Sequence, residues 1–254
     1  MNIILLDQTE VTDNRAILRD RRADHIRAVL GAACGDILRT GIINGPMGTS
    51  RVTRLTTDAV ELETLHTGPV PPRPDTDLIL ALPRPIMLKR IFSQAATLGV
   101  GRIILINASR VEKSFFAASL LQRENYHPLL LHGLEQAVDT LVPKVMIHQR
   151  FRPFVEDVLP DLLVDCPVRL VAHPGPFPSL PAVVSPPLRH RAILAIGPEG
   201  GWVDYEIEKF QALGFAAFAM GPRILRVDTA VPALLAQVSL LRQVIAPVSA
   251  APCR

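Results

Sequence analysis

The alternation of hydrophobic and polar residues changes character about a quarter of the way along this 254-residue chain. In residues 1–67, apolar residues partly alternate with polar ones, a pattern typical of strands with one buried face. We expect three such strands, at residues 37–43, 50–55 and 59–65. One short helix is expected before them, at residues 23–30. The pattern predicts a small barrel-like β unit.

A proline-rich segment follows this first part of the chain. Residues 68–74 read Gly-Pro-Val-Pro-Pro-Arg-Pro, with four prolines in seven positions. Proline has no backbone N–H and cannot continue a strand ladder or a helix, so such a segment acts as a semi-rigid spacer. We therefore expect two domains, at residues 1–70 and 75–248.

Beyond the spacer, short apolar runs alternate with helix-like periodicity. Buried-type strands are expected at residues 78–82, 102–106, 145–147, 168–171, 192–196 and 215–220. Helices are expected at residues 85–98, 129–140, 154–163, 204–213 and 230–245, the last capped by Thr229 with Pro232 in its first turn. The alternation predicts an α/β domain with a mostly parallel sheet. The last helix is apolar nearly all round, which favours an oligomer interface over the monomer core.

Two of the predicted strands end in the same kind of turn. Residues 192–196 run into Gly-Pro-Glu-Gly-Gly-Trp, and residues 215–220 run into Gly-Pro-Arg-Ile-Leu-Arg. Glycine allows positive φ and a close approach of a ligand to the backbone, and proline fixes the turn. If the two strands are neighbours, the turns form a ligand crevice at the carboxyl edge of the sheet. Plain strand-to-helix connections are the alternative, since short glycine motifs also match by chance.

Composition and charge narrow the class of protein. The chain is 48% hydrophobic and 20% charged, which supports a packed core and argues against disorder. No apolar run reaches the roughly 18 residues of a membrane span, and the first residues lack a signal peptide's basic start, so we expect a cytoplasmic protein with no membrane partner. The three cysteines and seven histidines do not cluster at ligand spacings, so we expect no metal. A net charge of +3 does not by itself indicate a nucleic-acid partner.

The paired turns carry a resemblance to a known family. Residues 197–201, followed by residues 221–230, resemble the two C-terminal motifs of the bacterial 16S ribosomal RNA uridine-N3 methyltransferases of the SPOUT superfamily. Further stretches resemble the same family, at residues 25–30 with 35–36, 96–100, and 133–137 with 142–145. The resemblance implies a PUA-like N-terminal β-barrel that helps to bind RNA and a SPOUT-type α/β domain with a trefoil knot. It also implies S-adenosyl-L-methionine (SAM) as methyl donor and a homodimer formed through the C-terminal domain.

The resemblance further implies roles for individual residues. The cofactor would lie against Ala172, His173, Gly197, Pro198, Glu199, Gly200, Gly201, Met220, Gly221, Ile224, Leu225 and Arg226. For an RNA substrate we expect contacts from Arg22, Arg27, Arg84, Arg110 and Arg223, with an ordinary solvated arginine as the alternative at each position. Glu135 and Gln136 match the family, but no role follows for them.

Two residues of the second motif are candidates for the chemistry. Uridine N3 must lose its proton before it attacks a methyl group, so the site needs a base or a cation that stabilises the anionic ring. Arg226 is the expected cation, with an ion pair to Glu199 or Asp228 as its alternative role. Asp228 is the lower-ranked base, with a place in the first turn of a helix as its alternative. The family often has glutamate where this chain has Asp228, and arginine where it has Gly31.

Two further residues of the first motif have alternative roles. Glu199 is expected to order its own turn or to contact a partner subunit. Trp202 is expected to pack on the following helix or to contact a ligand.

The sequence thus predicts a SAM-dependent methyltransferase that acts on N3 of a uridine in 16S ribosomal RNA of the small subunit. Three alternatives stay open. The same fold could act on another RNA, the chain could be a non-catalytic RNA-binding assembly factor, or it could bind a nucleotide and no RNA. SAM binding separates the enzymes from the last two.

Overall fold

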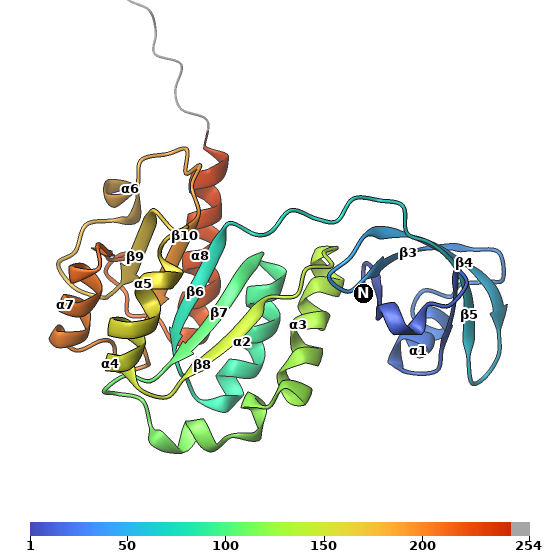
Figure 1. Ribbon diagram of the computed structural model, residues 1–254, viewed down its shortest axis with the longest axis horizontal. Coiled ribbons are helices and arrows are strands. Elements are labelled where there is room, and N and C mark those ends of the chain that lie inside the picture. Colours follow the sequence, from blue (N-terminus) through green and yellow to red (C-terminus); the bar gives the residue numbers. More distant parts are fainter. Residues whose placement is uncertain (245–254) are drawn as a thin grey trace, which may run out of the picture.

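A computed structural model describes residues 1–244 of the chain in two parts (Figure 1). A five-stranded sheet with one helix forms the N-terminal domain, and a six-stranded sheet with the remaining helices forms the C-terminal domain. Residues 66–75 between them are neither helix nor strand, in keeping with the proline-rich sequence. The expected end of the second domain at residue 248 and that of the last helix at Ile245 lie outside the described residues.

The N-terminal domain is built on five short strands. Its elements are β1 (Ile4–Leu6), β2 (Arg15–Leu18), α1 (Arg21–Ala28), β3 (Ile37–Ile42), β4 (Met47–Leu55) and β5 (Val60–Leu65), with a 3-10 turn at Gln8–Glu10. The strand order is β1-β3-β4-β5-β2, and only the β1–β3 pair is parallel. The pairings leave β1 and β2 as edge strands, so closure into a PUA-like barrel stays a prediction. The sequence pattern misses β1 and β2 because three or four residues are too few to show alternation.

The C-terminal domain contains one parallel sheet. Its strands are β6 (Thr76–Ala81), β7 (Val100–Ile106), β8 (Lys144–His148), β9 (Val168–Ala172), β10 (Ala192–Ile196) and β11 (Ala216–Phe218). They lie in the order β11-β9-β10-β6-β7-β8, and every neighbouring pair is parallel. The predicted α/β class with a parallel sheet is therefore confirmed.

Helices connect these strands. They are α2 (Pro85–Thr97), α3 (Arg123–Ala137), α4 (Phe151–Pro153), α5 (Leu159–Leu162), α6 (Leu180–Val183), α7 (Asp204–Ala212) and α8 (Val227–Gln243). A π-helical turn at Phe154–Val158 joins α4 to α5, and 3-10 turns at Lys113–Ala117 and Ser119–Leu121 precede α3. Helix α2 packs against both α3 and α8.

Three predicted helix boundaries, two of α3 and one of α8, are wrong. Helix α3 begins at Arg123 rather than Leu129, because the Gln122 carbonyl already accepts from the backbone N–H groups of Asn125 and Tyr126. It ends at Ala137 rather than Thr140, because Val138 takes the left-handed conformation with φ 59°. Helix α8 begins at Val227, three residues before the prediction, because the Arg226 carbonyl accepts from the N–H groups of residues 229 and 230. Thr229 is therefore inside the helix and does not cap it.

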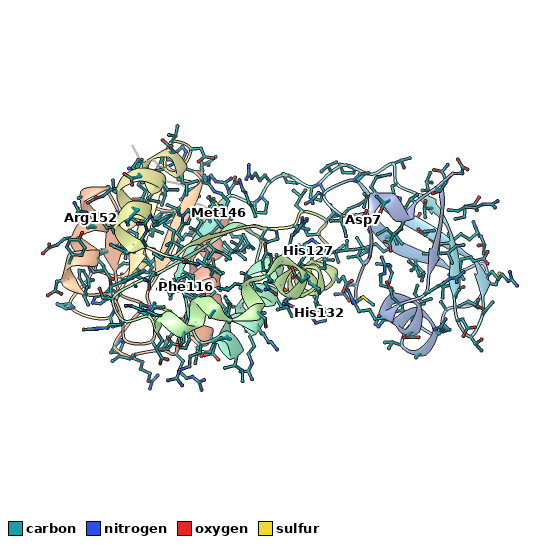
Figure 2. The ribbon with its side chains drawn as sticks, turned by 60° about the horizontal axis from the view of Figure 1, so that its bottom comes forward. Asp7, Phe116, His127, His132, Met146 and Arg152 are labelled. Carbon is teal, nitrogen blue, oxygen red and sulfur yellow. The ribbon has the colours of Figure 1, made fainter. Side chains whose placement is uncertain are left out.

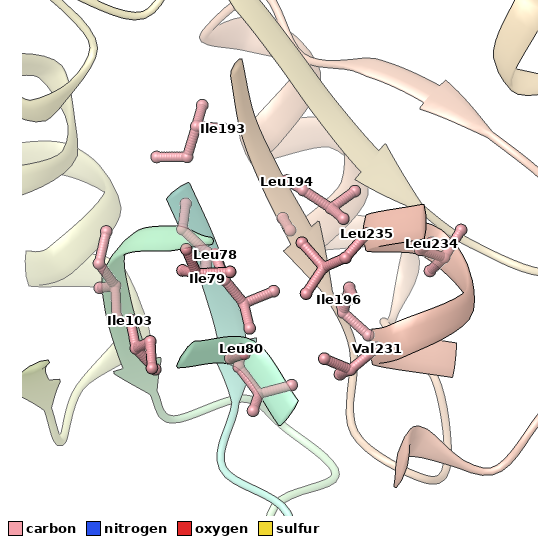
Figure 3. Close-up of a cluster of buried hydrophobic side chains, with 14 of the residues drawn as sticks. Leu78, Ile79, Leu80, Ile103, Ile193, Leu194, Ile196, Val231, Leu234 and Leu235 are labelled. Carbon is pink, nitrogen blue, oxygen red and sulfur yellow. The ribbon is translucent and has the colours of Figure 1, made fainter. Parts of the chain in front are cut away.

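The core of the C-terminal domain lies between the central strands and α8. Leu80 of β6 and Ile196 of β10 are buried, and so are Val231 and Leu235 of α8. Figure 3 shows these side chains facing one another across the space between the sheet and the helix. The described part of α8 thus contributes to the monomer core. The sequence alone favours an oligomer interface over this role.

Candidate active site

A cavity of about 320 Å³ opens at the carboxyl ends of three strands, β9, β10 and β11. The two Gly-Pro turns follow β10 and β11, which are not neighbours, since β9 lies between them. The condition that the two strands be adjacent is therefore not met. Residues 172–174, which follow β9, fill the gap and form the third wall. Three loops rather than two surround the cavity.

The cavity wall contains most of the residues that the resemblance assigns to the cofactor. Eleven of the twelve line it, and Arg226 alone does not. Seven further residues line it as well, namely Pro174, Ile196, Trp202, Arg223, Val227, Ala230 and Leu234. The last three belong to α8 or its first turn, and the only sequence signal for them is that this helix is apolar nearly all round. The sequence therefore predicts the loops of the cavity better than its floor.

Glycine is required in the first loop because neighbouring groups approach it closely. A Cβ atom on Gly197 would lie 3.2 Å from both the backbone N and Nε1 of Trp202. A Cβ on Gly200 would lie 2.9 Å from Cδ of Arg110. Gly201 has φ 74°, a conformation that residues with a side chain rarely adopt, and its N–H donates to the Pro198 carbonyl at 2.8 Å. The loop is therefore compact, and three of its five residues are glycines with no side chain to occupy the cavity.

Two ring nitrogens of the wall lack a hydrogen-bond partner among the described residues. Trp202 is 2% exposed and packs edge-on against Phe210 of α7 with ring centroids 5.1 Å apart, but its Nε1 is unpaired. The Nδ1 atom of His173 is also buried and unpaired. Burial lowers the pKa of His173, the positive charge of Arg110 lowers it further, and Asp204 opposes the shift. His173 is therefore neutral at pH 7. Trp202 both packs on helix α7 and lines the cavity, so the structure is compatible with each of its two expected roles.

Side-chain hydrogen bonds connect the first loop, and helix α7 after it, to neighbouring segments. The Oε1 atom of Glu199 accepts from the backbone N–H of Arg84, which precedes α2, at 3.3 Å. The Arg110 guanidinium donates to the Gly200 carbonyl. The Glu206 carboxylate, 1% exposed, accepts from the N–H of Ser109 at 2.7 Å. Glu199 thus orders its own turn by linking it to α2.

The candidate catalytic pair lies beside the cavity rather than in its wall. Arg226 precedes α8, and its side chain is 72% exposed. The Asp228 side chain is 12% exposed and lies in the first turn of α8, as its alternative role requires. The Oδ1 atom of Asp228 is 3.6 Å from Nε of Arg226, and its Oδ2 is 3.6 Å from Nη1 of Arg90. Arg226 is therefore exposed at the rim and loosely paired to Asp228, and its assignment to the cofactor stays a prediction.

The five arginines predicted to contact RNA separate into two groups. Arg84, Arg110 and Arg223 are exposed around the cavity. Arg22 is 9% exposed, pairs with Glu10 and Asp20 at 2.5 and 2.7 Å and donates to the Leu5 carbonyl. Every nitrogen of its guanidinium is used inside the N-terminal domain, which disfavours the predicted RNA contact.

Arg27 belongs with Arg22 rather than with the cavity. Its Nη2 pairs with Asp24 at 2.6 Å, and its Nη1 donates to the Thr56 carbonyl at 3.1 Å. Arg22 and Arg27 of α1 are thus both paired with acidic residues of the N-terminal domain.

Two kinds of feature are not found among the described residues. Within residues 1–244 there is no group of three or more histidine, cysteine or acidic residues arranged to hold a metal ion. None of the described helices is long and apolar enough to cross a membrane.

Comparison with known proteins places this geometry in a family. The sequence profile of the RNA methyltransferase domain matches residues 71–239, more than half of the chain. Ribosomal RNA small subunit methyltransferase E of Treponema pallidum is 34% identical over 248 residues, which cover 94% of this chain and 90% of the relative. The protein of the same name from Synechocystis is 29% identical over 228 residues, which cover 89% of this chain and 69% of the relative.

Solved structures share the fold. That of a ribosomal RNA small subunit methyltransferase E from Neisseria gonorrhoeae bound to S-adenosyl methionine has a TM-score of 0.73 at 22% identity, covering 95% of this chain and 98% of that one. A probable rRNA-methyltransferase from Porphyromonas gingivalis has a TM-score of 0.75 at 19% identity, covering 96% and 99%. At these identities the likeness shows the fold alone. The profile match and the Treponema relative show that the chain belongs to the ribosomal RNA small subunit methyltransferase E family of RNA methyltransferases.

Proposed function

We propose that this chain transfers a methyl group from SAM to N3 of a uridine in 16S ribosomal RNA. The observation that carries the proposal is the cavity at the ends of β9, β10 and β11, whose wall contains eleven of the twelve residues expected to hold SAM. Membership of a family of small-subunit ribosomal RNA methyltransferases supports the substrate class.

The residues of the cavity fit such a cofactor. Its volume of about 320 Å³ is within the range of small-molecule sites, roughly 300–1,000 Å³. Ile196, Leu225 and Leu234 offer apolar surface to a base ring. The unpaired nitrogens of His173 and Trp202 are the kind of isolated polar group that fixes a ligand's orientation. When bound, SAM supplies the methyl group from its sulfonium centre.

The rim residues would act on the acceptor base. Arg226 is exposed beside the cavity, so its guanidinium can reach a uracil ring placed there and stabilise the negative charge that develops when N3 loses its proton. Asp228 is proposed as the anchor that orients Arg226 rather than as the base, because its carboxylate already faces two guanidinium groups at 3.6 Å. Holding the ring close to the methyl group removes much of the entropic barrier to a bimolecular reaction.

Three further features belong to the same proposal. Arg84, Arg110 and Arg223 would contact RNA at the cavity, and the PUA-like N-terminal domain would contact it elsewhere. The protein would act as a homodimer through its C-terminal domain. A trefoil knot would run through the cavity loops, which is supported by the chain's return from β10 to β11 on the far side of β9.

Two experiments test the proposal. Calorimetry should detect SAM binding, and its absence would favour the RNA-binding assembly factor. Mapping of ribosomal RNA from a deletion strain should show one missing N3-methyluridine, restored when the gene is returned. Loss of a different modification would favour another position or another RNA, and an unchanged map would contradict the proposal.

A further inference from the structure

The N-terminal domain meets the C-terminal domain at the end of α3. The residues that form this contact, here called the α3 joint, are Asn2, Ile3, Arg21, Asn44, Glu135 and Thr140. In Figure 2, His127 and His132 mark the part of α3 that faces the N-terminal domain, where Asp7 lies. Glu135 belongs to the family-like stretch for which the sequence offers no role.

Glu135 is the charged centre of the α3 joint. Its side chain is 1% exposed. The Arg21 guanidinium of α1 donates to both carboxylate oxygens, from Nη2 to Oε1 at 2.6 Å and from Nη1 to Oε2 at 2.9 Å. Such a bidentate pair fixes orientation as well as distance. The pair joins residues 114 positions apart in the sequence, one from each domain.

Backbone groups of the first residues cap the end of α3. The Glu135 carbonyl accepts from the N–H groups of Asn2 and Ile3 at 2.8 and 3.2 Å, and the Gln136 carbonyl accepts from the Asn2 side chain at 2.8 Å. The last carbonyls of a helix have no partner within it, and the helix dipole is negative there. The N-terminal domain thus supplies both the donors and the cation, Arg21, that this helix end needs.

A second set of hydrogen bonds lies directly beyond α3. Thr140 is fully buried, and its Oγ1 donates to the Gly45 carbonyl at 2.7 Å. The Thr140 carbonyl accepts from the Asn44 N–H at 2.8 Å, and Asn44 Oδ1 accepts from the Val142 N–H at 2.9 Å. The turn between β3 and β4 is therefore attached to the loop after α3.

The apolar cores of the two domains also meet in this region. Ile4 and Leu6 of β1 belong to the core of the N-terminal domain, whereas Ile3 and Leu5 belong to that of the C-terminal domain. Alternate residues of one strand thus pack into two cores, as the period of a strand allows. With the hydrogen bonds around it, this packing holds the two domains in one relative orientation.

We propose that Glu135 and Arg21 are positioning residues for the RNA substrate, and that the α3 joint keeps the N-terminal domain as a fixed arm. The inference rests on the proposed function. Figure 1 shows the N-terminal domain beyond α3, at the opposite end of the molecule from β9 and α7. An RNA that contacts both the arm and a cavity makes two linked contacts, and a rigid connection raises the effective concentration for the second. Loosening the α3 joint therefore weakens RNA binding without changing the cavity.

The test compares Glu135→Gln, Arg21→Gln and the double variant with the wild-type chain. The probes are SAM alone, by calorimetry, and small ribosomal subunits from a deletion strain, by methyl transfer from labelled SAM. We expect the KM for subunits to rise about tenfold or more, with the dissociation constant for SAM and kcat unchanged. The double variant should lose no more than the worse single variant, because the two residues act through one pair. Small-angle X-ray scattering should show a larger radius of gyration.

A matched control uses another arginine–glutamate pair of the N-terminal domain. Arg54 and Glu61 are 3.5 Å apart, both are exposed, and the pair does not cross the domain boundary. Arg54→Gln with Glu61→Gln should leave the scattering profile unchanged. Arg21→Lys, which keeps the charge but not the bidentate contact, should raise the KM for subunits less than Arg21→Gln does.

Three results would overturn the inference. They are a wild-type KM in the Glu135 and Arg21 variants, a fall in SAM affinity or kcat that matches loss of folded protein, and effects that add in the double variant. The outcome is distinct from a failure of the proposed function. If the wild-type chain transfers no methyl group, the scattering change and the affinity for the same subunits, measured by sedimentation, still report on the α3 joint.

Discussion

At the scale of single residues, Arg226 has the clearest predicted phenotype. Its side chain is 72% exposed and lies outside the cavity wall, so it should serve the acceptor and not the cofactor. Arg226→Ala should reduce kcat by roughly 10²–10³-fold, the loss typical when one stabiliser of transition-state charge is removed. The dissociation constant for SAM should stay within about twofold of the wild-type value, because in this proposal the charge of Arg226 acts on the transition state and not on cofactor binding. Calorimetry and single-turnover methyl transfer measure the two quantities.

The control for Arg226 keeps the charge and removes the planar fork. Arg226→Lys should retain more activity than the alanine variant, since a point charge still stabilises the anionic ring. Wild-type turnover in Arg226→Ala would exclude the residue from the mechanism.

Glu10 makes a prediction about stability and pH. The hydrogen bond from Arg22 is the main cause that holds the pKa of Glu10 below its ordinary value of 4.5. A carboxyl group with a lowered pKa in the folded state stabilises the fold above pH 4.5, and this contribution disappears as the pH falls through the folded pKa. Glu10→Gln should therefore lower the free energy of unfolding at pH 7 by about 1–2 kcal/mol, and by less near pH 3.5. Urea denaturation at pH 7, 5 and 3.5 checks this, and a loss that does not change with pH would contradict it.

These residues also show where sequence reasoning stops at this scale. Arg22 and Arg84 are equally basic and equally plausible as RNA ligands in the sequence. Only the fold brings Glu10 and Asp20 around Arg22, while it leaves Arg84 exposed beside the cavity. Glycine positions were easier to predict, because close approach and positive φ are local requirements.

At the scale of secondary-structure elements, α3 contains a removable defect. Pro128 lies inside the helix and is exposed, five residues after its start. Its ring has no N–H for the carbonyl of Glu124, four residues earlier, and the ring crowds that carbonyl. Pro128→Ala should therefore raise the free energy of unfolding by about 1–3 kcal/mol, seen as a higher thermal midpoint by calorimetry.

A second proline supplies the comparison. Pro85 occupies the first position of α2, where its fixed φ suits the helix and no hydrogen bond is lost. Pro85→Ala should leave stability unchanged or slightly lower. If both substitutions raised the midpoint equally, the cause would be the unfolded chain and not the interior of α3.

The start of α3 is not visible in the composition of the sequence. The predicted helix begins at Leu129, directly after Pro128, whereas α3 begins at Arg123. The true start depends on the Gln122 carbonyl, whose two hydrogen bonds leave no compositional signal. The buried parallel strands, in contrast, were found because continuous apolar runs bounded by turn residues are visible in the sequence.

At the scale of the whole molecule, the strand order and the contact between the two domains could not be predicted from the sequence. Apolar runs mark β9, β10 and β11 but do not state that β9 lies between the other two. The proline-rich spacer suggests two separate units, whereas β1 packs into both cores. Both facts depend on contacts between residues far apart in the sequence, such as Val168 with Ala192 and Arg21 with Glu135, which a single sequence does not reveal.

The quaternary prediction concerns the exposed side of α8. Leu240 is 59% exposed although its helix contributes Val231, Leu234 and Leu235 to the core. Single exposed apolar residues are common on monomers, so the prediction rests on the sequence of α8, which is apolar nearly all round and favours an oligomer interface. The chain should therefore sediment with twice its monomer mass, and Leu240→Glu should shift it to monomers because burying an unpaired carboxylate in an interface is unfavourable.

Val164 supplies the matched control for this surface. It is 86% exposed, follows α5 and lies away from α8 in the sequence, so Val164→Glu should leave the dimer intact. Light scattering after size exclusion measures all three chains at the same concentration, since association depends on it. A monomeric wild-type chain would contradict the homodimer. If both variants dissociated equally, the dimer would be sensitive to added charge in general. The result would then contradict an interface on α8.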